Sequence, residues 1–434
     1  MKIGFISLGC SKNLVDSENV MGMLKQGGHE LVNAPELAEA IIINTCGFIN
    51  SAKEEAINTI LEMAEYKEKN CKKLIVIGCM AQRYKEELSV EMPEIDAIIS
   101  IKEYPKMNDI LSEVLGIEHL ESYGKSERLI STKPWTAYLK IAEGCSNRCT
   151  YCAIPLIRGG NVSFPMEDIL SSAKQLATRG VKELILIAQD TTKYGLDIYG
   201  ELSLLRLLKE LNQIEGFHWI RILYMYPDEI NDELIEGMAQ LDKVLPYFDI
   251  PMQHGNDKML ELMNRRGSVA SVVNLVEKIR STLTQPTLRT TYIVGFPHET
   301  DLEFNDLLEF TKTIRWNRMG AFTYSPEEDT VAYDMDETVE EEVKEERLNQ
   351  LMSIQEEIAL ADNQMYVGQT IEVLVEAQDG LRGQYRGRGK NSAPDEVDGY
   401  VIFDSPRVIE FGTFVQVKIE KALTHDLIGI EVNA

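Results

Sequence analysis

The 434-residue chain has no apolar run long enough to cross a membrane. Runs such as residues 74–78 are only a few residues long, whereas a spanning helix needs about 20. We therefore do not expect a membrane protein. The 44% hydrophobic and 26% charged residues are typical of a globular chain, and the length suggests about three domains.

Basic residues are scarce relative to acidic ones. Seventy Asp and Glu side chains stand against 44 Lys and Arg, which gives a formal net charge of −26. A field of this sign repels polyanions, so binding of nucleic acid by the whole surface is not expected. The same field attracts a basic macromolecule.

Cysteine is also sparse, because seven residues are too few and too scattered for a disulfide-rich scaffold. The N-terminus, with Lys2, a short apolar stretch and Cys10, is similar to a lipoprotein signal. However, the stretch is at the lower limit for a signal peptide, and Cys10 leads directly into an expected helix. We therefore expect a cytoplasmic protein, in which unpaired thiols favour metal binding or catalysis.

Short apolar segments alternate with helical patterns over residues 1–120. This alternation predicts an α/β domain with a doubly wound parallel sheet. The expected strands are 2–7, 40–44, 73–77 and 96–100, and the expected helices are 14–26, 52–68, 82–90 and 104–115. Residues 118–133 lack periodicity, and we place a linker at 121–133.

A second alternation fills residues 134–366. Six strands are expected at 138–142, 183–188, 219–223, 247–251, 288–294 and 321–324. Helices are expected between them at 166–179, 202–213, 228–241, 257–283 and 301–313. Six strands with five crossovers predict a partial, open (βα)6 barrel rather than a closed eight-stranded one. The acidic run 327–346 is interpreted as a solvated connector into a charged helix, 339–360.

The pattern changes to β after residue 367. Five short strands are expected at 370–376, 383–389, 399–403, 413–420 and 428–432. Their glycine-rich turns predict a small OB-like β-barrel over residues 367–434.

Three cysteines, Cys145, Cys149 and Cys152, are spaced C-x3-C-x2-C in EGCSNRCTYC. So short a loop can wrap three thiolates around one compact iron–sulfur cluster. Zinc normally takes four closed ligands, and no nearby Cys or His supplies a fourth. Three ligands on a four-iron cluster leave one iron open to a substrate or cofactor.

Three further cysteines, Cys10, Cys46 and Cys79, are far apart in sequence but each follows a predicted strand. The carboxyl ends of parallel strands share one edge, where ligands bind at the switch in strand order. These thiols could therefore hold a second cluster, although buried structural cysteines remain an alternative. Cys71 has no such neighbours and is interpreted as an ordinary thiol.

The barrel predicts its own site, because active sites of (βα) barrels lie at the carboxyl ends of the strands. Polar and aromatic residues gather there: Glu143, Gln189, Asp190, Tyr224, Tyr226, Pro227, Gln253, His254, Gly295, Phe296, Pro297, Tyr324 and Ser325. Structural roles remain open for some of them. Gln253 and His254 could cap the next helix, Tyr224 could be core, and the glycine and prolines could form turns.

The motif EGCSNRCTYC, with Tyr151 before its third cysteine, resembles the cluster motif of the radical S-adenosylmethionine (radical SAM) superfamily. Over nearly its whole length the chain is similar to the methylthiotransferases of that superfamily. These combine an N-terminal cluster domain, a radical SAM barrel and a C-terminal TRAM domain.

Further segments resemble the methylthiotransferase branch that modifies an aspartate of the small-subunit ribosomal protein numbered twelve: SLGCSKNLVDSE, NTCGFI, IPLIRG, IAQDTTKYG, YFDIPMQH, RTTYIVGFP, YSPEEDTVAY and SAPDEVDG. The relatives that act on tRNA usually read GCQMN or GCKVN where this chain reads GCSKN. The chain departs from the family pattern at Phe164, where Arg often follows the serine, and at His298, where Gly usually follows GFP.

The resemblance implies two [4Fe–4S] clusters and SAM as cofactors. By it, Cys145, Cys149 and Cys152 hold the cluster that cleaves SAM, and Cys10, Cys46 and Cys79 hold an auxiliary cluster that delivers sulfur. We expect Tyr151, Gln189 and Asp190 to line the SAM pocket. The implied reaction puts sulfur and a methyl group on the β-carbon of the aspartate, an unactivated C–H position that needs radical chemistry supplied by a cofactor.

The implied partners are a basic ribosomal protein as substrate and an external electron donor. Charge favours the protein over tRNA, because residues 367–434 hold seven basic and eleven acidic side chains. A barrel that grips tRNA should be basic, whereas one that docks a basic protein can be acidic. The alternatives are a tRNA-adenosine methylthiotransferase and a non-catalytic iron–sulfur or zinc protein that binds partners.

Overall fold

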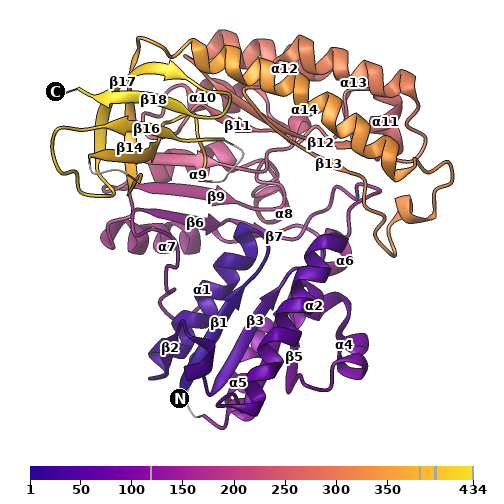
Figure 1. The fold of residues 1–434 in the computed structure, drawn as a ribbon, viewed down its shortest axis with the longest axis vertical. Helices are drawn as coiled ribbons and strands as arrows, with labels where there is room; N and C mark the ends of the chain where they lie inside the picture. Colours follow the sequence, from indigo (N-terminus) through magenta and orange to yellow (C-terminus); the bar gives the residue numbers. More distant parts are fainter. Residues whose placement is uncertain (118–119, 381–382, 395–397, 433–434) are drawn as a thin grey trace. The chain divides into compact units, whose positions relative to one another are not determined.

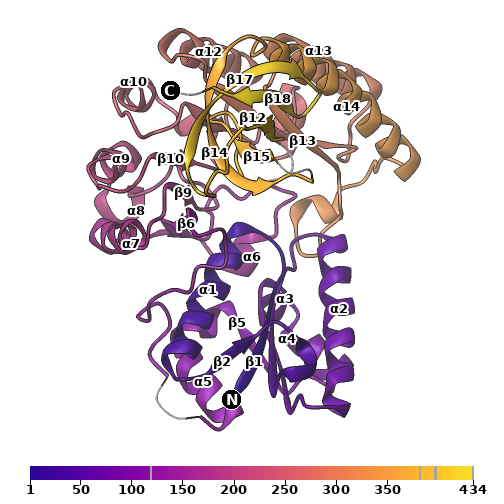
Figure 2. The same ribbon diagram turned by 60° about the vertical axis from the view of Figure 1, so that its left-hand side comes forward.

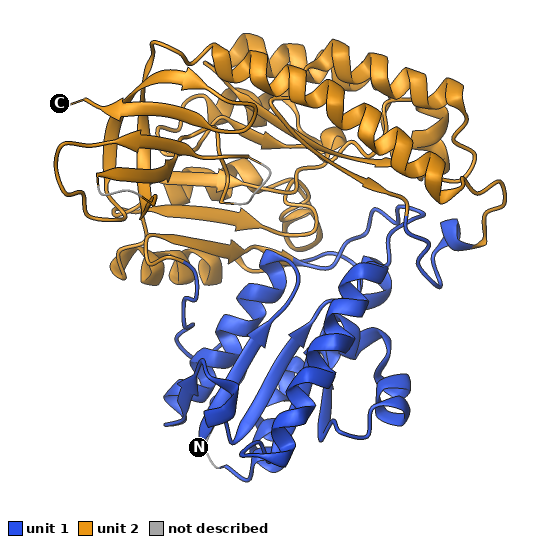
Figure 3. Cartoon of the chain, viewed as in Figure 1, with its two compact units in different colours: residues 1–132, 143–162, 325–333 blue, residues 133–142, 163–324, 334–434 orange. Residues whose placement is uncertain are grey.

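The computed structural model describes residues 1–117, 120–380, 383–394 and 398–432. These residues form two compact units (Figure 3). Unit 1 comprises residues 1–132, 143–162 and 325–333, and unit 2 comprises 133–142, 163–324 and 334–434. Among the described residues, no helix is long and apolar enough to cross a membrane.

Unit 1 is built on a five-stranded parallel sheet in the order β2-β1-β3-β4-β5. Its strands are β1 (Lys2–Ser7), β2 (Glu30–Val32), β3 (Ala40–Thr45), β4 (Lys73–Gly78) and β5 (Ala97–Ser100). The prediction of a doubly wound parallel sheet is confirmed. The expectation missed β2, which is three residues long and only partly buried. The strand order reverses between β1 and β3, which makes the carboxyl ends of these strands the switch point.

Helices cover both faces of this sheet (Figure 1). The helices of unit 1 are α1 (Ser11–Gln26), η1 (Pro35–Leu37), α2 (Asn50–Ala64), η2 (Glu65–Glu68), α3 (Cys79–Arg83), α4 (Lys85–Glu91), η3 (Ile101–Lys106), α5 (Met107–Leu115) and α6 (Ile154–Arg158). Alternate strand residues point to opposite faces, so Ile42 packs with α1 and α5 while Ile41 packs with α2 and α4. The expected single helix at 82–90 is wrong, because the chain breaks at Tyr84 between α3 and α4.

Unit 2 contains six parallel strands in two three-stranded sheets, β10-β9-β6 and β11-β12-β13. The strands are β6 (Thr136–Lys140), β9 (Glu183–Ile187), β10 (Trp219–Ile222), β11 (Tyr247–Asp249), β12 (Thr287–Val294) and β13 (Arg318–Thr323). A parallel bridge between Ile220 and Val244 joins the first sheet to the segment before β11. The expected open barrel of six strands is confirmed. Two short strands, β7 (Ala142–Glu143) and β8 (Val162–Ser163), flank the segment with the tight cysteine triple.

The later helices are α7 (Met166–Thr178), α8 (Leu196–Tyr199), α9 (Leu204–Asn212), η4 (Pro227–Glu229), α10 (Asp232–Met238), α11 (Asp257–Leu262), α12 (Val269–Thr282), α13 (Asp301–Ile314), η5 (Val331–Asp334) and α14 (Glu341–Gln364). The single helix expected at 257–283 is wrong. Asn264 and Gly267 have φ of 52° and 87°, which turn the chain, and the Ser268 side chain caps the second helix.

The last five strands close into a small barrel in the order β14-β15-β16-β18-β17 (Figure 2). They are β14 (Thr370–Gln378), β15 (Gln384–Arg388), β16 (Val401–Asp404), β17 (Phe414–Ala422) and β18 (Leu427–Glu431). The expected OB-like barrel is confirmed. Residues 118 and 119 beside the expected linker, and residues 395–397 of SAPDEVDG, lie outside the described residues.

The small barrel packs against the amino ends of the (βα) strands. Glu183, the first residue of β9, is fully buried and accepts hydrogen bonds from Arg388 of β15 and Arg221 of β10. At the start of β11, the Tyr247 hydroxyl donates to Asp398 over 2.6 Å. The small barrel therefore lies at the amino ends of the strands. The site predicted from the sequence lies at the opposite, carboxyl ends.

Candidate functional site

The dispersed cysteines lie at the carboxyl edge of the unit 1 sheet, as expected. Cys10 follows β1 and precedes α1, Cys46 follows β3 directly, and Cys79 follows β4 as the first residue of α3. Cys10 and Cys46 therefore occupy the switch point between β1 and β3, with Cys79 on the next strand. An edge of this kind is where doubly wound sheets bind their ligands.

The three thiols influence one another electrostatically. Cys10 is exposed, Cys46 is half-buried and Cys79 is buried. Burial raises the pKa of Cys46, and it raises the pKa of Cys79 to about 12, against the opposing charge of Arg158. Negative charge on Cys10 also raises the pKa of both thiols. Bound metal would stabilise the thiolate forms that burial disfavours here.

No group of three or more Cys, His, Asp or Glu side chains converges on a single ion in the part of the chain that the structure describes. A four-iron cluster does not require its ligands to converge on one ion, because each thiolate binds a separate iron at a corner of the cluster. The free thiols at the sheet edge supply the donor type that such a cluster needs, so the residues present fit it.

A buried arginine supports the edge from beneath. The Arg158 guanidinium donates to Glu143, Asp16 and the Asn13 side chain over 2.8, 3.0 and 2.5 Å. It also lies 3.5 Å from the Cys79 sulfur. Burial lowers the pKa of Arg158, but the carboxylate of Asp16 and the other anionic neighbours outweigh it, so the pKa stays well above its usual value.

Asn13 ties the strand ends together. Its amide nitrogen donates to the carbonyls of Leu8 and Thr45 over 3.1 and 3.0 Å, which links the loop after β1 to the end of β3. Its amide oxygen accepts from Arg158 and, over 3.4 Å, from the Cys79 thiol. One fully buried side chain on α1 thus contacts the segments that carry all three dispersed cysteines.

The tight triple lies in the loop between β7 and α6. The Cys145 amide donates to Gly159 over 3.0 Å, and the Cys152 amide donates to Cys149 over 3.1 Å. Gly144, with φ of 73°, has the Gly160 carbonyl 2.2 Å from where a Cβ would be, so only glycine fits here. All three cysteines are half-buried and none forms a disulfide, and the compact loop fits a cluster.

Both triples belong to unit 1. Ala153 and Ile157, which follow the tight triple, form an apolar cluster with Cys79, and Ile101 packs against it. The helix after one triple therefore contacts the residue that completes the other.

The three residues expected to line a SAM pocket are divided between the units. Tyr151 is half-buried in unit 1, whereas Gln189 and Asp190 follow β9 in unit 2. Asp190 is 1% exposed, and its carboxylate accepts from the Thr192 amide and hydroxyl over 3.1 and 2.5 Å. Asp190 thereby shapes the loop in which it lies.

Two other strand-end residues have backbone conformations that favour glycine. Tyr224 after β10 and Gln253 after β11 have φ of 60° and 73°. Such strain is concentrated at functional sites. His254 is different: it is fully buried, its Nε2 lies 3.1 Å from Glu299, and its Nδ1 accepts from the Asn256 amide at the start of α11. The N-cap of α11 is Asn256, whose side chain accepts from the Met259 amide, so His254 supports the cap residue rather than capping the helix itself.

Of the two departures from the family pattern, the structure gives a local explanation for His298. His298 has φ of 66°, the region where a glycine is least strained, and it lies 2.8 Å from Glu337 and 3.3 Å from Asp336. The Phe164 amide donates to the Ile141 carbonyl, and the Phe164 carbonyl accepts from the Tyr194 hydroxyl.

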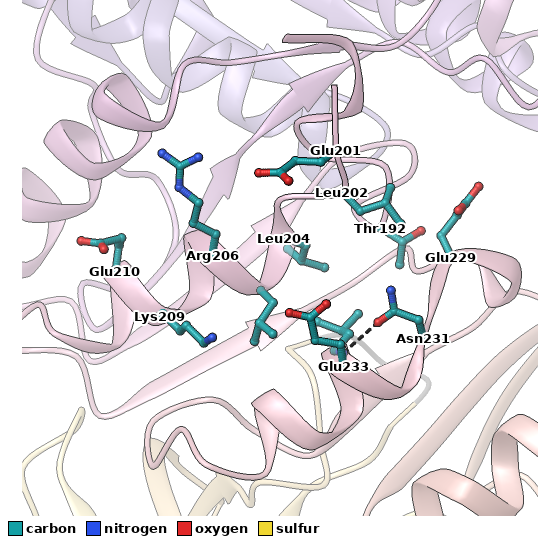
Figure 4. Close-up of a pocket in the computed structure, with 12 residues that line it drawn as sticks. Thr192, Glu201, Leu202, Leu204, Arg206, Lys209, Glu210, Glu229, Asn231 and Glu233 are labelled. Carbon is teal, nitrogen blue, oxygen red and sulfur yellow. Dashed lines mark hydrogen bonds between the residues drawn. The ribbon is translucent and has the colours of Figure 1, made fainter. Parts of the chain in front are cut away.

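A separate cavity of about 260 Å³ lies in unit 2 between α9 and α10 (Figure 4). Arg206 and Lys209 of α9 line it together with acidic residues such as Glu201 and Glu233. It includes Thr192 but neither Gln189 nor Asp190 among its lining residues.

Sequence reasoning overlooked several residues of the site. Asn13, Asp16 and Arg158 lie inside segments used for the family resemblance, yet nothing in their spacing showed that they meet. In unit 2, the Arg265 guanidinium lies 4.2 Å from the centre of the Tyr226 ring and the Lys193 ammonium 6.0 Å from it, at the strand ends. Lys193 lies within the segment IAQDTTKYG, whereas no motif included Arg265.

Comparison with protein families agrees with this architecture. Residues 2–100 match the uncharacterized protein family UPF0004, residues 139–311 the radical SAM superfamily and residues 367–432 the TRAM domain.

Three relatives share the whole architecture and carry the name ribosomal protein uS12 methylthiotransferase RimO. The relative from Acetivibrio thermocellus is 47% identical over 100% of this chain and 98% of that protein. Those from Caldicellulosiruptor saccharolyticus and Clostridioides difficile are 46% and 48% identical, over 99% of this chain and 99% and 98% of theirs.

Solved structures share the fold at much lower identity. The radical SAM methyltransferase TsrM from Kitasatospora setae, with cobalamin and a [4Fe-4S] cluster bound, has a TM-score of 0.54 at 10% identity, over 75% of this chain and 73% of that one. The cobalamin-dependent SAM radical enzyme OxsB has a TM-score of 0.53 at 11% identity, over 82% and 56%. At this identity the likeness concerns the fold.

Proposed function

This chain belongs to the RimO family of ribosomal protein uS12 methylthiotransferases, and we propose that it adds a methylthio group to the β-carbon of an aspartate in that protein. Family membership makes it a radical SAM enzyme with a [4Fe–4S] cluster and SAM as cofactors. The second cluster, its ligands and the SAM contacts are part of the proposal.

The observation that carries the proposal is the presence in unit 1 of two sets of three cysteines, none of them in a disulfide. We assign Cys145, Cys149 and Cys152 to the cluster that binds SAM. We assign Cys10, Cys46 and Cys79 to an auxiliary cluster. Three protein ligands leave the fourth iron of each cluster open, which suits one cluster to SAM and the other to sulfur.

Bound clusters and SAM would relay the electron and supply the radical and the sulfur, which is chemistry that protein side chains lack. The chain supplies position. Gly144 allows the tight loop to fold back on Gly159 and Gly160, and Gly9 allows the backbone to approach Cys46. Asn13 holds the ends of β1 and β3 at a fixed separation.

For the remaining parts we propose boundaries and partners. The cluster domain is 1–120, the linker 121–133, the radical SAM barrel 134–366 and the TRAM domain 367–434. Tyr151, Gln189 and Asp190 contact SAM. The acidic TRAM domain favours a basic ribosomal protein over tRNA. An external donor supplies electrons, and the reaction takes place in the cytoplasm.

The decisive experiment supplies reconstituted enzyme with SAM, sulfide and a reductant under anaerobic conditions. Parallel reactions receive the purified ribosomal protein, small ribosomal subunits or tRNA, and each product is analysed by mass spectrometry. We expect one methylthio group on an aspartate of the ribosomal protein and none on tRNA. Methylthiolation of tRNA alone would overturn the proposed substrate.

Metal analysis of the same preparation tests the cofactors. Two four-iron clusters correspond to about eight irons and eight sulfides per chain. A preparation with one zinc, no sulfide and no SAM cleavage would contradict the assignment of both cysteine triples.

A further inference from the structure

Arg158 is a buried cation beside the candidate cluster ligand Cys79. Its side chain is 1% exposed, and the side chain of its partner Asp16 is fully buried. Burying a guanidinium away from water costs free energy unless ion-paired and hydrogen-bonded partners compensate its charge. The cation is therefore held in one position.

Its partners come from separate elements of unit 1. Asn13 and Asp16 lie on α1, Glu143 ends β7, and Cys79 begins α3, while Arg158 itself ends α6, six residues after Cys152. The guanidinium is thus the point where the loop of one cysteine triple meets the edge that bears the other.

The contacts of the Arg158 guanidinium fix where its positive charge lies. The two carboxylates, Asp16 and Glu143, hold the guanidinium from two sides at 3.0 and 2.8 Å. Nη2, the nitrogen bonded to Asp16 and Asn13, also lies 3.5 Å from the Cys79 sulfur. An N–H donor and a positive charge at a ligand sulfur stabilise the more negative, reduced state of an iron–sulfur cluster.

We propose that Arg158 is a positioning residue that holds the Cys79 sulfur and raises the reduction potential of the auxiliary cluster. This inference rests on the proposed auxiliary cluster and deepens it. Arg158 touches neither SAM nor substrate in this role, because it acts through the cysteine.

The test uses full-length protein in which Cys145, Cys149 and Cys152 are all alanine, so that only the auxiliary cluster can form. In this parent we introduce Arg158→Gln, Arg158→Lys and the pair Asp16→Asn with Arg158→Gln. The pair removes the fully buried Asp16 charge together with that of Arg158, so only Glu143, whose side chain is 20% exposed, loses its cation. Iron content, melting temperature and the midpoint potential of the cluster are measured for each.

A matched control is the ion pair of Glu18, which lies on α1 like Asp16. Arg128 is 12% exposed and pairs over 3.2 Å with Glu18, a 2% exposed carboxylate of α1. Arg128→Gln therefore removes a similar ion pair that involves no cysteine in its salt bridge. We expect it to lower the melting temperature without changing the potential.

We expect Arg158→Gln and the double variant to retain iron and to have a lower potential. At the parent midpoint, the ratio of reduced to oxidised cluster should fall about tenfold, which corresponds to about 59 mV for one electron. Arg158→Lys should restore part of the difference because it keeps the charge. Loss of iron in both glutamine variants, with a melting temperature equal to that of Arg128→Gln, would also support the positioning role.

An unchanged potential in both glutamine variants would overturn the role of Arg158, as would a similar shift in Arg128→Gln. The parent variant distinguishes a failure of this inference from a failure of the proposed function. If the parent itself binds no iron, the auxiliary cluster is refuted, whatever the Arg158 variants show.

Discussion

Gly9 packs directly against Cys46. A Cβ at position 9 would lie 2.8 Å from the Cys46 Cβ and 3.2 Å from its sulfur, and the φ of Gly9 is +84°. Both the backbone and the neighbouring cysteine therefore require glycine there. This contact places the first two dispersed cysteines side by side, and it gives the first prediction.

Gly9→Ala should displace Cys46 and lower iron content toward that of a single cluster, because about half of the iron belongs to the auxiliary site. The cleavage of SAM, measured as release of 5′-deoxyadenosine, should continue. Iron analysis and chromatography of the products check both points.

Gly28→Ala is the matched control. Gly28 has a similar φ of +81°, but no atom lies within 4 Å of where its Cβ would be. The backbone strain is thus shared and the contact with cysteine is not. Equal iron loss in the two variants would mean that strain, rather than the displacement of Cys46, causes the effect.

Single alanine substitutions should separate the two cysteine triples. Cys46→Ala should abolish methylthio product while SAM is still cleaved, and Cys149→Ala should abolish both. Cys71→Ala should keep both activities, because Cys71 is 3% exposed among apolar residues of the unit 1 core. Product formed by Cys46→Ala would contradict the auxiliary assignment.

The buried ion pairs of Glu183 should dominate the attachment of the small barrel. Glu183, Arg221 and Arg388 are all fully buried, and removing one partner leaves an uncompensated charge. Arg388→Met disrupts this contact and should therefore lower the free energy of unfolding by about 3–5 kcal/mol. Lys312→Ala, which breaks an exposed pair with Glu309, should cost at most about 1 kcal/mol. Denaturant titration compares the two.

The same carboxylate predicts how this contact depends on pH. Burial raises the pKa of Glu183, but the charges of Arg388 and Arg221 outweigh it, and the pKa falls below its usual value of 4.5. The stabilisation is therefore complete above about pH 4.5 and is lost as the pH falls through the lower, folded-state pKa. The difference in unfolding free energy between the native chain and Glu183→Gln should shrink in acid. A difference that grows in acid would contradict the sign of the shift.

Local patterns were sufficient for much of the fold. Strand β1 was predicted residue for residue, because an apolar run bounded by polar residues has one interpretation in an α/β chain. The division of 257–283 into two helices was missed, because its cause, the positive φ of Asn264, depends on the tertiary turn. The prediction that residues 327–346 form a solvated connector is wrong for Glu327. This side chain is 2% exposed and pairs with Arg83 and Lys53.

The sequence by itself determined where the six thiols stand, because the C-x3-C-x2-C spacing and the position of a cysteine after each strand depend only on local order. The tertiary structure decided the surroundings of those thiols. Arg158, Asn13 and Asp16 meet beneath Cys79 only after α6 and α1 have packed in unit 1. Long-range burial of a charge leaves no periodic trace in a sequence, since it depends on which elements pack together rather than on which residues are neighbours.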